Sequence, residues 1–456
     1  MRIHQTDFAR QSVWRAILAS SFPLIIAELV NLLYSQVDRI YIAHISGIGS
    51  VALTGVGLCL PIISLISAFA RLFGSNGGGP LCAIELGKGD NQEAERYLGQ
   101  SFTLTVVTGL VITVLVLIFS RPILYLFGAS DQTFPYAQSY LVIYVLGSVP
   151  VLISLTLTPF INALGYSSVG MVAVVVGALT NIILDPILIF LFDLGVRGAA
   201  IATVISQCIS AIFCIAFLRR GHLPIRLRFM PLEGRRVARI CMLGTSGFTM
   251  GATNSIVQLV CNKCAAIWGG DLYVGVMTIL NSIREIFSTP MNGFSSGATP
   301  VMSYNYGRGD GRRVMKASQL LLVMMLVYSG LIWALIYILP DPFIRLFTTD
   351  GTLMEASHHA LQIYFFGFIF MSFHMSGQQT FVALGYAKQA VFFSLFRKVI
   401  IVVPLTIILP YFIGVDGVVL AEPISNVVGG MATYSVMRLT IFRKLRRQLA
   451  KASLRP

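Results

Sequence analysis

Long apolar runs recur along the whole of this 456-residue chain. Each is about 20–25 residues long, which is the length that an α-helix needs to cross the hydrocarbon layer of a bilayer. Transmembrane β-strands instead show about ten residues of alternating hydrophobicity, a pattern that these runs lack. Because 56% of the residues are hydrophobic and only 11% are charged, the chain is too apolar for a soluble protein of this size. We therefore predict an all-α, polytopic membrane protein.

The second half of the chain repeats the first. Three short motifs return in the same order: Leu86–Asp90 as Tyr306–Asp310 and Ala163–Tyr166 as Ala383–Tyr386, both at the same offset, and Gly195–Gly198 as Gly414–Gly417, at an offset shorter by a single position. Such matches indicate a duplicated unit of six spans. Because six is even, both copies enter the membrane from the same side, so we predict two six-helix bundles related by a pseudo-twofold axis along the membrane normal.

The apolar runs and the charged stretches between them give the boundaries of this organisation. We predict an N-terminal bundle over 1–218, a cytoplasmic linker over 219–237, a C-terminal bundle over 238–440 and a basic cytoplasmic tail over 441–456. The twelve spans are predicted at 15–44, 52–83, 98–119, 134–160, 168–192, 196–218, 238–267, 272–300, 316–339, 356–382, 389–413 and 416–440.

The basic residues are distributed unequally between the two sides of the predicted membrane. Lys and Arg number 33 against 19 Asp and Glu, which gives a formal net charge of +14. With the N-terminus inside, most of the basic residues fall in cytoplasmic segments, whereas the opposite loops hold Arg121, Arg197 and Arg345. This asymmetry follows the positive-inside rule and places both termini in the cytoplasm. We therefore expect the charge to face anionic lipid headgroups and expect no nucleic-acid partner.

A polar interruption lies within the apolar segment from Val169 to Phe192. Asp185 falls in the hydrocarbon layer, where an ionised carboxylate costs about 2.5–3.5 kcal/mol, so it is a functional candidate. Asn181 lies one helical turn earlier on the same face, and Pro186 frees the carbonyl of Ile182. Oxygens of this kind suit a hard cation such as Na⁺, and a lone buried carboxylate alternatively takes a proton. A third interpretation is that Asn181 and Asp185 only bridge helices through hydrogen bonds.

Two further oxygen-bearing side chains lie at the same predicted depth. Asp38 in span one and Thr203 in span six are each about six or seven residues from the outer end of their span, as is Asp185 in span five. At 1.5 Å per residue this depth is roughly 9–11 Å below the outer surface, with Asn181 one turn deeper. We therefore predict that the four side chains converge on one level of the first bundle.

Span one carries a polar stripe, because Glu28, Asn31, Tyr34 and Asp38 recur at three- to four-residue spacing. A polar stripe within the membrane faces either a cavity or another helix. Asn31 and Tyr34 therefore either line a substrate chamber or pack against span five or six. The candidates for the wall of this chamber are Glu28, Asn31, Tyr34 and, in span four, Asn162. Pro23 breaks the backbone hydrogen bond to Ala19 and is a candidate bending point of span one.

The second bundle lacks the acidic set of the first. At the offset of the first two repeated motifs, Asp185 corresponds to Leu405 and Asp38 to Gln258. The second bundle instead carries Glu285 in span eight and Glu422 in span twelve. Glu285 is either a second cation site or the partner of a neighbouring basic side chain, and we favour the pair. Glu422 corresponds to Thr203, which favours a functional role over packing.

This combination resembles the multidrug and toxic compound extrusion (MATE) family over nearly the whole chain. The resemblance rests on the two six-span bundles, Asp38 within Val37–Ala43, and the Gly-Lys-Gly-Asp and Gly-Arg-Gly-Asp motifs after spans two and eight. Asn181-x-x-x-Asp185-Pro186 and Ala199–Thr203 resemble its DinF-type and MepA-like prokaryotic branch. The resemblance implies that Asp38, Asn181, Asp185 and Thr203 bind Na⁺ or H⁺, and that span one bends at Pro23. It also implies a location in the cytoplasmic (inner) membrane of a prokaryote.

The favoured function is therefore a secondary antiporter that exports amphipathic, cationic organic compounds in exchange for H⁺ or Na⁺ by alternating access. The direction of transport rests on the resemblance. We expect a monomer in the lipid bilayer, no enzymatic activity and no cofactor beyond the coupling ion. No nucleotide-binding P-loop motif is present in the sequence, so the energy is expected to come from the ion gradient.

Two other functions remain open at this stage. A flippase or exporter of a lipid-linked or metabolite substrate would need basic residues along its cavity. The intramembrane candidates are few and dispersed, so this function is less favoured than the antiporter; they are Arg39, Arg71, Lys263, Arg284, Arg397 and Lys398. A membrane-embedded transferase would need paired aspartates in loops or a catalytic His or Cys set. The loops between the predicted spans are short and plain, so we rank this enzyme below both transporters.

Overall fold

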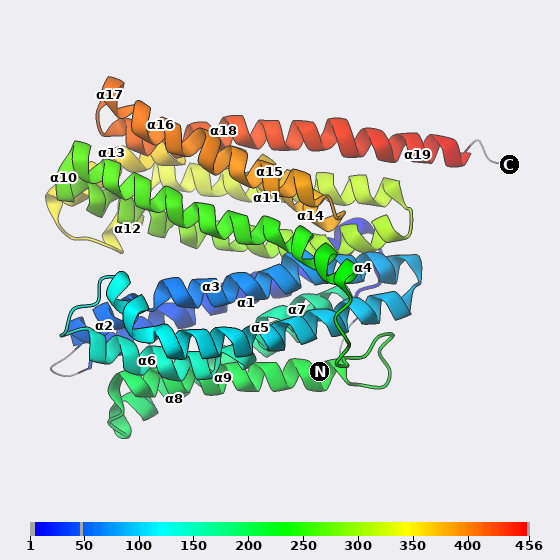
Figure 1. Ribbon diagram of the computed structural model, residues 1–456. Helices are drawn as coiled ribbons and strands as arrows, with labels where there is room; N and C mark the ends of the chain where they lie inside the picture. The colour runs from blue at the N-terminus through cyan, green and yellow to red at the C-terminus, as the bar shows by residue number, and fades with distance from the viewer. Residues whose placement is uncertain (1–4, 46–48, 454–456) are drawn as a thin grey trace. The chain divides into compact units, whose positions relative to one another are not determined.

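The computed structural model describes residues 5–45 and 49–453, and these form helices joined by short connections (Figure 1). The first four residues of the predicted N-terminal bundle and the last three of the predicted tail lie outside the described residues. The helices group into two compact units. The first contains residues up to Asp7 and Phe22–Gly244, and the second contains Phe8–Ser21 and the chain from Thr245 onward.

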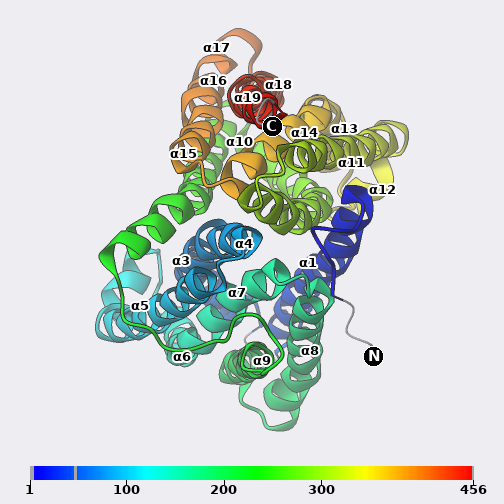
Figure 2. The ribbon, with the colours of Figure 1, turned by 90° about the vertical axis from the view of Figure 1, so that its right-hand side faces the viewer.

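In the first unit the helices run along one another (Figure 1). Figure 2 looks along them and shows α9 between α8 on one side and α6 and α7 on the other, in agreement with their packing contacts. The elements are α1 (Val13–Ala43, from Phe22 on), α2 (Gly49–Gly57), α3 (Leu60–Phe73), the π-helical turn η1 (Gly74–Gly78), α4 (Gly79–Lys88), α5 (Asn91–Leu126), α6 (Phe134–Leu146), α7 (Ser148–Ala163), α8 (Ser167–Pro186), the π-helical turn η2 (Ile187–Leu191) and α9 (Gly195–Leu218).

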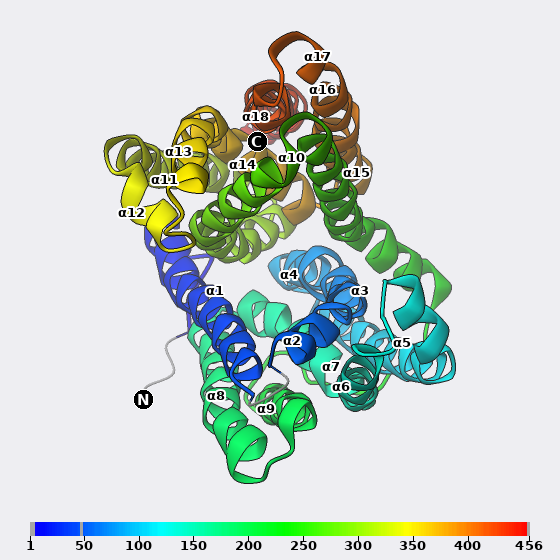
Figure 3. The ribbon, with the colours of Figure 1, turned by 90° about the vertical axis from the view of Figure 1, so that its left-hand side faces the viewer.

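In the second unit, α18 packs against α13, α14 and α16, an arrangement that Figure 3 shows from the opposite end to Figure 2. The elements are α10 (Gly234–Gly307, from Thr245 on), α11 (Gly311–Ile338), α12 (Pro340–Arg345), α13 (Gly351–Phe365), α14 (Phe368–Ala383), α15 (Ala387–Leu395), the π-helical segment η3 (Phe396–Val402), α16 (Val403–Ile408), α17 (Pro410–Ile413), α18 (Asp416–Met437), the π-helical turn η4 (Arg438–Phe442) and α19 (Arg443–Ser453).

The described residues hold 7 helices that are long and apolar enough to cross a membrane, and 3 further helix pairs that qualify when each bent pair is taken as one span. One of the seven, α10, contains Gly270 in a non-helical conformation (φ 63°, ψ −165°) and is two helices joined end to end. A residue with a side chain is strained at this positive φ, so glycine permits the turn between spans seven and eight. With α10 counted as two and with α18 added, these helices correspond one to one to the twelve predicted spans.

The repeated motifs adopt the same local structure in both halves. Gly89 and Gly309 end their helices with φ of 83° and 81°. In each copy the next residue is an aspartate that caps the following helix: Asp90 accepts from the Glu93 amide at 2.9 Å, and Asp310 from the Arg313 amide at 3.0 Å. Because an aspartate at this position satisfies an otherwise unpaired amide, the motif begins span three and span nine in the same way.

The N-terminal segment packs in the second unit, although the predicted division places it in the N-terminal bundle. Asn305 Nδ2 donates to the Phe8 carbonyl at 3.1 Å, and Arg313 donates to the same carbonyl at 2.9 Å. Val13 and Ile17 of α1 are buried in the hydrophobic core of this unit. Sequence division follows charged linkers, and these contacts join residues 297 and 305 positions apart, so the hydrophobic pattern gives no sign of them. The predicted boundaries at 218 and 238 stay predictions.

Candidate functional site

Helices α8 and α9 lie close together because glycines line their contact. A Cβ atom at Gly177 would lie 2.2 Å from Ser210 Oγ, and one at Gly198 would lie 2.7 Å from the Leu188 carbonyl. Ser210 Oγ donates to the Ala173 carbonyl at 2.9 Å, which links the two helices directly. This close packing brings the polar face of α8 against Thr203 on α9.

Three of the four predicted ion-site residues form one hydrogen-bonded group. Asn181 Nδ2 donates to Asp185 Oδ1 at 3.3 Å and to Thr203 Oγ1 at 3.4 Å. The Asn181 and Asp185 side chains are completely buried, and Thr203 is 6% exposed. The three residues lie together, as the sequence predicts. This geometry is consistent with an ion site and equally with a hydrogen-bonded bridge between helices.

Asp38 is the fourth member, and its carboxyl group lies within hydrogen-bonding reach of the Asp185 carboxyl group. Two carboxylates that share one space repel each other unless a proton or a cation lies between them. Asp38 Oδ1, Asn181 Oδ1 and Asp185 Oδ2 are buried, and none of the three has a hydrogen-bond partner among the described residues. Buried polar atoms are nearly always paired, so these oxygens fit a hard cation or a proton as the missing partner.

Further polar side chains lie near this acidic pair, and apart from Tyr34 the sequence analysis missed them. The Tyr34 hydroxyl hydrogen-bonds Gln207, which also accepts from Ser154 Oγ at 2.7 Å. Tyr140 and Tyr144 stack with ring centroids 6.0 Å apart, and Tyr140 lies in the field of the Asp38 carboxylate. Gln207 follows Thr203 by one helical turn, and that spacing is the signal that predicts it for this face.

The other candidates from span one differ in their surroundings. Tyr34 packs against span six through Gln207, which is one of the two predicted alternatives, whereas Asn31 is exposed. Glu28 is partly buried and lies in the field of Arg71. Pro23 is buried within the continuous helix α1, directly after the point where the chain passes from the second unit to the first.

The contact that Asn162 makes is with a residue outside the acidic pair. It is buried at the C-terminal end of α7, and its Oδ1 atom would be 2.7 Å from a Cβ at Gly170. Within residues 5–45 and 49–453 this oxygen has no hydrogen-bond partner. Its place in the wall of a substrate chamber therefore stays a prediction.

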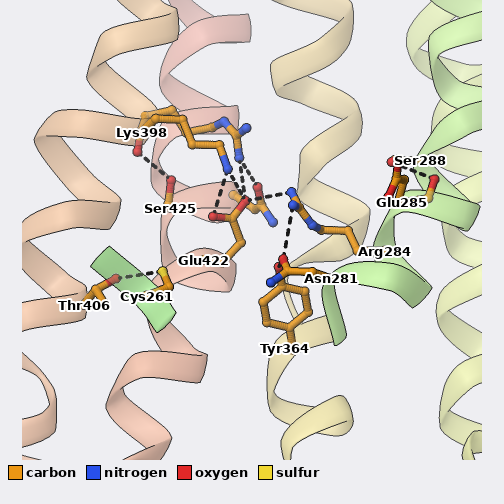
Figure 4. Close-up of polar contacts among 12 residues, drawn as sticks. Cys261, Asn281, Arg284, Glu285, Ser288, Tyr364, Lys398, Thr406, Glu422 and Ser425 are labelled. Carbon is orange, nitrogen blue, oxygen red and sulfur yellow. Dashed lines mark hydrogen bonds and ion pairs between the residues drawn. The ribbon is translucent and has the colours of Figure 1, made fainter. Parts of the chain in front are cut away.

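In the second unit, Glu422 is the centre of an ion-pair cluster. Its carboxylate contacts Lys398 at 2.8 Å, Arg397 at 3.1 Å and Arg284 at 3.6 Å. Arg284 forms its ion pair with Glu422, while Glu285 lies beside Ser288 and is exposed (Figure 4), so the favoured pairing of Glu285 with a neighbouring basic residue stays a prediction. Consecutive residues of a helix point in different directions, so adjacency in the sequence does not make a pair. The interpretation of the basic residues as dispersed is wrong for Arg284, Arg397 and Lys398.

No group of three or more His, Cys, Asp or Glu side chains in the described part of the chain has the arrangement of a transition-metal site. The seven cysteines do not form disulfides, and Cys261 and Cys264 are both free thiols. The two candidate sites are the carboxylate–amide group around Asp185 in the first unit and the ion-pair cluster around Glu422 in the second.

A known protein family matches both halves of this chain. Residues 23–187 and 248–408 match the MatE family, one segment in each half of the chain. The chain belongs to the MatE family. The two matched segments agree with the duplication predicted from the repeated motifs, and membership confirms the predicted family, a transporter rather than an enzyme.

Individual relatives resemble this MatE protein over nearly its full length. Multidrug export protein MepA of Staphylococcus haemolyticus (strain JCSC1435) is 26% identical over 443 residues, covering 95% of this chain and 96% of the relative. The MepA protein of Staphylococcus aureus (strain MRSA252) is 24% identical over 436 residues, covering 95% of each chain. The solved structure of a multidrug resistance MATE family transporter of the MOP superfamily, in an outward-facing conformation, gives a TM-score of 0.90 at 22% identity over 97% of this chain and 99% of that chain. This likeness confirms the predicted all-α membrane fold.

Helix α9 closely approaches η2, the turn that follows α8, and this contact yields a prediction. In Gly198→Val the new side chain meets the backbone of Leu188, which cannot rotate away, so α9 must move relative to α8 and Thr203 must leave Asn181. We expect a loss of about 1–3 kcal/mol of stability and weaker ion dependence of stability. Thermal unfolding of the purified protein with and without Na⁺ measures both. Gly57→Val is the matched control, because a Cβ at Gly57 meets nothing within 4 Å. An unchanged unfolding temperature in Gly198→Val would contradict the proposed constraint.

Proposed function

We propose that this MatE protein is a secondary antiporter that exports small amphipathic and cationic organic compounds in exchange for H⁺ or Na⁺. The observation that carries the proposal is the group of unpaired buried oxygens on Asp38, Asn181 and Asp185 among the residues that the structure describes. Relatives named multidrug export proteins over 95% of the chain support the substrate class. The distribution of basic residues supports a location in the cytoplasmic membrane with both termini in the cytoplasm.

Coupling follows from a difference in affinity between two conformations. A cation or proton that occupies the space between Asp38 and Asp185 removes their repulsion, and an empty pair favours the conformation in which the carboxylates lie farther apart. Asp38 stands on α1, so such a separation moves this helix, and Pro23 is the position where a bend costs least. A cationic substrate competes for the same carboxylates, which prevents ion and substrate from crossing together.

The test is ethidium efflux from proteoliposomes that contain the purified protein, with a Na⁺ gradient and a pH gradient imposed separately. We expect efflux with one gradient and none when both are collapsed, and the effective gradient identifies the coupling ion. Efflux that continues unchanged without either gradient would contradict coupled antiport.

A further inference from the structure

The cluster around Glu422 contains more positive than negative charge. Lys398 Nζ lies 2.8 Å and 3.1 Å from the two carboxylate oxygens, and Arg397 Nη1 lies 3.1 Å from Oε1. Arg284 Nη1 approaches the same oxygen at 3.6 Å from α10 (Figure 4). Glu422 is the one carboxylate in the described residues that forms an ion pair with any of these three cations. The cluster therefore carries three positive charges and one negative charge.

The other polar partners of the cluster are neutral. Arg397 Nη1 donates to Asn426 Oδ1 at 2.7 Å, and Arg284 Nη2 donates to Asn281 Oδ1 at 3.3 Å. The Tyr364 hydroxyl also donates to Asn281 Oδ1, at 3.1 Å. An amide oxygen satisfies an N–H group, but it does not cancel a charge. The excess of two positive charges thus has no protein counter-ion within ion-pair distance among residues 5–45 and 49–453.

Two donors in this cluster are also unpaired. The Nε atoms of Arg284 and Arg397 are buried, and neither has a hydrogen-bond partner in the described part of the chain. Arg397 is 5% exposed and Lys398 is 3% exposed, so these groups have largely lost contact with solvent. A buried guanidinium N–H without an acceptor is costly, and an oxyanion is the partner that both the charge and the donor require.

The backbone around Arg397 and Lys398 helps to hold these side chains in place. Arg397 and Lys398 lie near the middle of the candidate span Ala387–Ile413, in the π-helical segment η3. The wider turn of a π-helix frees backbone carbonyls, and Ser425 Oγ donates to the Arg397 carbonyl at 2.9 Å. A Cβ at Gly429 would lie 2.9 Å from Arg397 Cγ, so this glycine makes room for the arginine side chain.

The duplicated first unit has a different polarity at corresponding positions. At the offset that relates Gly195–Gly198 to Gly414–Gly417, Thr203 corresponds to Glu422 and Gln207 to Asn426. At the offset of the other two repeated motifs, Gly177 stands where the second unit has Arg397. The same helix pair therefore presents unpaired carboxylate and amide oxygens in the first unit and unpaired guanidinium donors in the second, among the residues that the structure describes.

We propose that the cluster formed by Arg284, Arg397, Lys398 and Glu422 is an anion-binding site, which holds the carboxylate or phosphate group of an amphipathic organic anion. The anion accepts hydrogen bonds from the unpaired guanidinium donors and neutralises the positive charge that Glu422 leaves uncompensated. Arg284, whose side chain is 27% exposed, is the most accessible of the three cations and the first that an entering anion meets. The site lies within the second unit and is independent of ion coupling at Asp38 and Asp185.

The test is binding of 1-naphthyl phosphate to the purified full-length protein in a non-ionic detergent, followed by thermal unfolding and by titration. We expect the phosphate to raise the unfolding temperature, whereas 1-naphthol, which has the same ring and no charge, leaves it unchanged. Arg284→Gln should weaken binding by about tenfold or more, because it removes one charge and the donors that go with it. Lys263→Gln, in the preceding span of α10 and exposed, is the control and should bind as the wild type does.

The opposite substitution gives the opposite result. Glu422→Gln removes the competing carboxylate and should tighten binding of the phosphate by about tenfold or more. Because this variant leaves three cations without a counter-ion, the double variant Lys398→Met/Glu422→Gln serves as a second measurement. It keeps the excess of two positive charges and should bind the phosphate within a few-fold of the wild type. A cluster that serves structure alone predicts no binding to the wild type and none to either variant, and that result would overturn the proposal.

A second arm separates two sources of the anionic group. The protein in nanodiscs of phosphatidylcholine is compared with the protein in nanodiscs that also contain phosphatidylglycerol. A lipid headgroup occupies the site if phosphatidylglycerol weakens 1-naphthyl phosphate binding and raises the unfolding temperature of the wild type but not that of Arg284→Gln. Equal binding in both nanodiscs identifies a soluble organic anion. Binding that Arg284→Gln and Glu422→Gln both leave unchanged would overturn the assignment of the site.

Discussion

Replacement of Asp185 by asparagine is expected to reduce gradient-driven efflux of ethidium at least about tenfold, toward the level of liposomes without protein. The substitution keeps the size of the side chain and its hydrogen bond from Asn181, but it removes the charge that attracts a cation or accepts a proton. It also removes the repulsion between Asp185 and Asp38 that the proposed cycle uses. Efflux driven by each gradient in proteoliposomes measures the loss, and Asp38→Asn should show the same loss.

The control for this prediction is Asp193→Asn. Asp193 is exposed beyond the end of η2 and has a positive φ of 54°, a conformation that asparagine also tolerates. Efflux by this variant should equal that of the wild type at equal amounts of reconstituted protein. Normal, gradient-dependent efflux in both Asp38→Asn and Asp185→Asn would show that the buried group only bridges helices, which is the structural alternative.

The largest effect on stability is expected for Glu422→Gln. Removal of one partner from a buried ion pair leaves charge without compensation and typically costs about 3–5 kcal/mol. Here three cations lose their only carboxylate partner among the described residues, so the expected loss lies in that range. The free energy of unfolding of the purified protein, measured in mixed micelles with increasing sodium dodecyl sulfate, detects the change.

The double variant Lys398→Met/Glu422→Gln is the internal control for this effect. It removes a cation together with the carboxylate, and methionine fills most of the volume of the lysine stem, so much of the stability should return. The single variant Lys398→Met completes the double-mutant cycle, which measures the coupling between Lys398 and Glu422. If Glu422→Gln and the double variant lose the same free energy, the ion pair contributes little and the loss comes from packing.

The sequence predicted the arrangement of the first unit well for a physical reason. Asn181 and Asp185 are one turn apart on a helix, and their relation to Thr203 follows from the short connection between spans five and six. The family and the twelve-span fold were also within reach, because span length and repeated motifs are properties of the sequence alone. The role of the four ion-site residues stays a prediction.

The sequence pattern alone could not predict the ion-pair cluster of the second unit. Arg284 lies far along the chain from Arg397, Lys398 and Glu422, so their convergence depends on tertiary packing. Arg397 and Lys398 are consecutive, and a regular helix directs consecutive side chains to different sides. Both contact Glu422 from a π-helical segment, a local feature for which the hydrophobic period carries no signal.

Because Phe8–Ser21 belongs to the second unit, this segment reaches its final contacts only after most of the chain has been synthesised. The Phe8 carbonyl leaves the ribosome before its partner Asn305, which follows 297 residues later. At about 5–20 residues per second, that interval is roughly 15–60 s. During this time the start of α1 must remain in the membrane without its final neighbours. The second unit is therefore completed by a segment that is synthesised before most of the first unit, and a ribosome that stalls before Asn305 leaves the start of α1 without the partners that fix it.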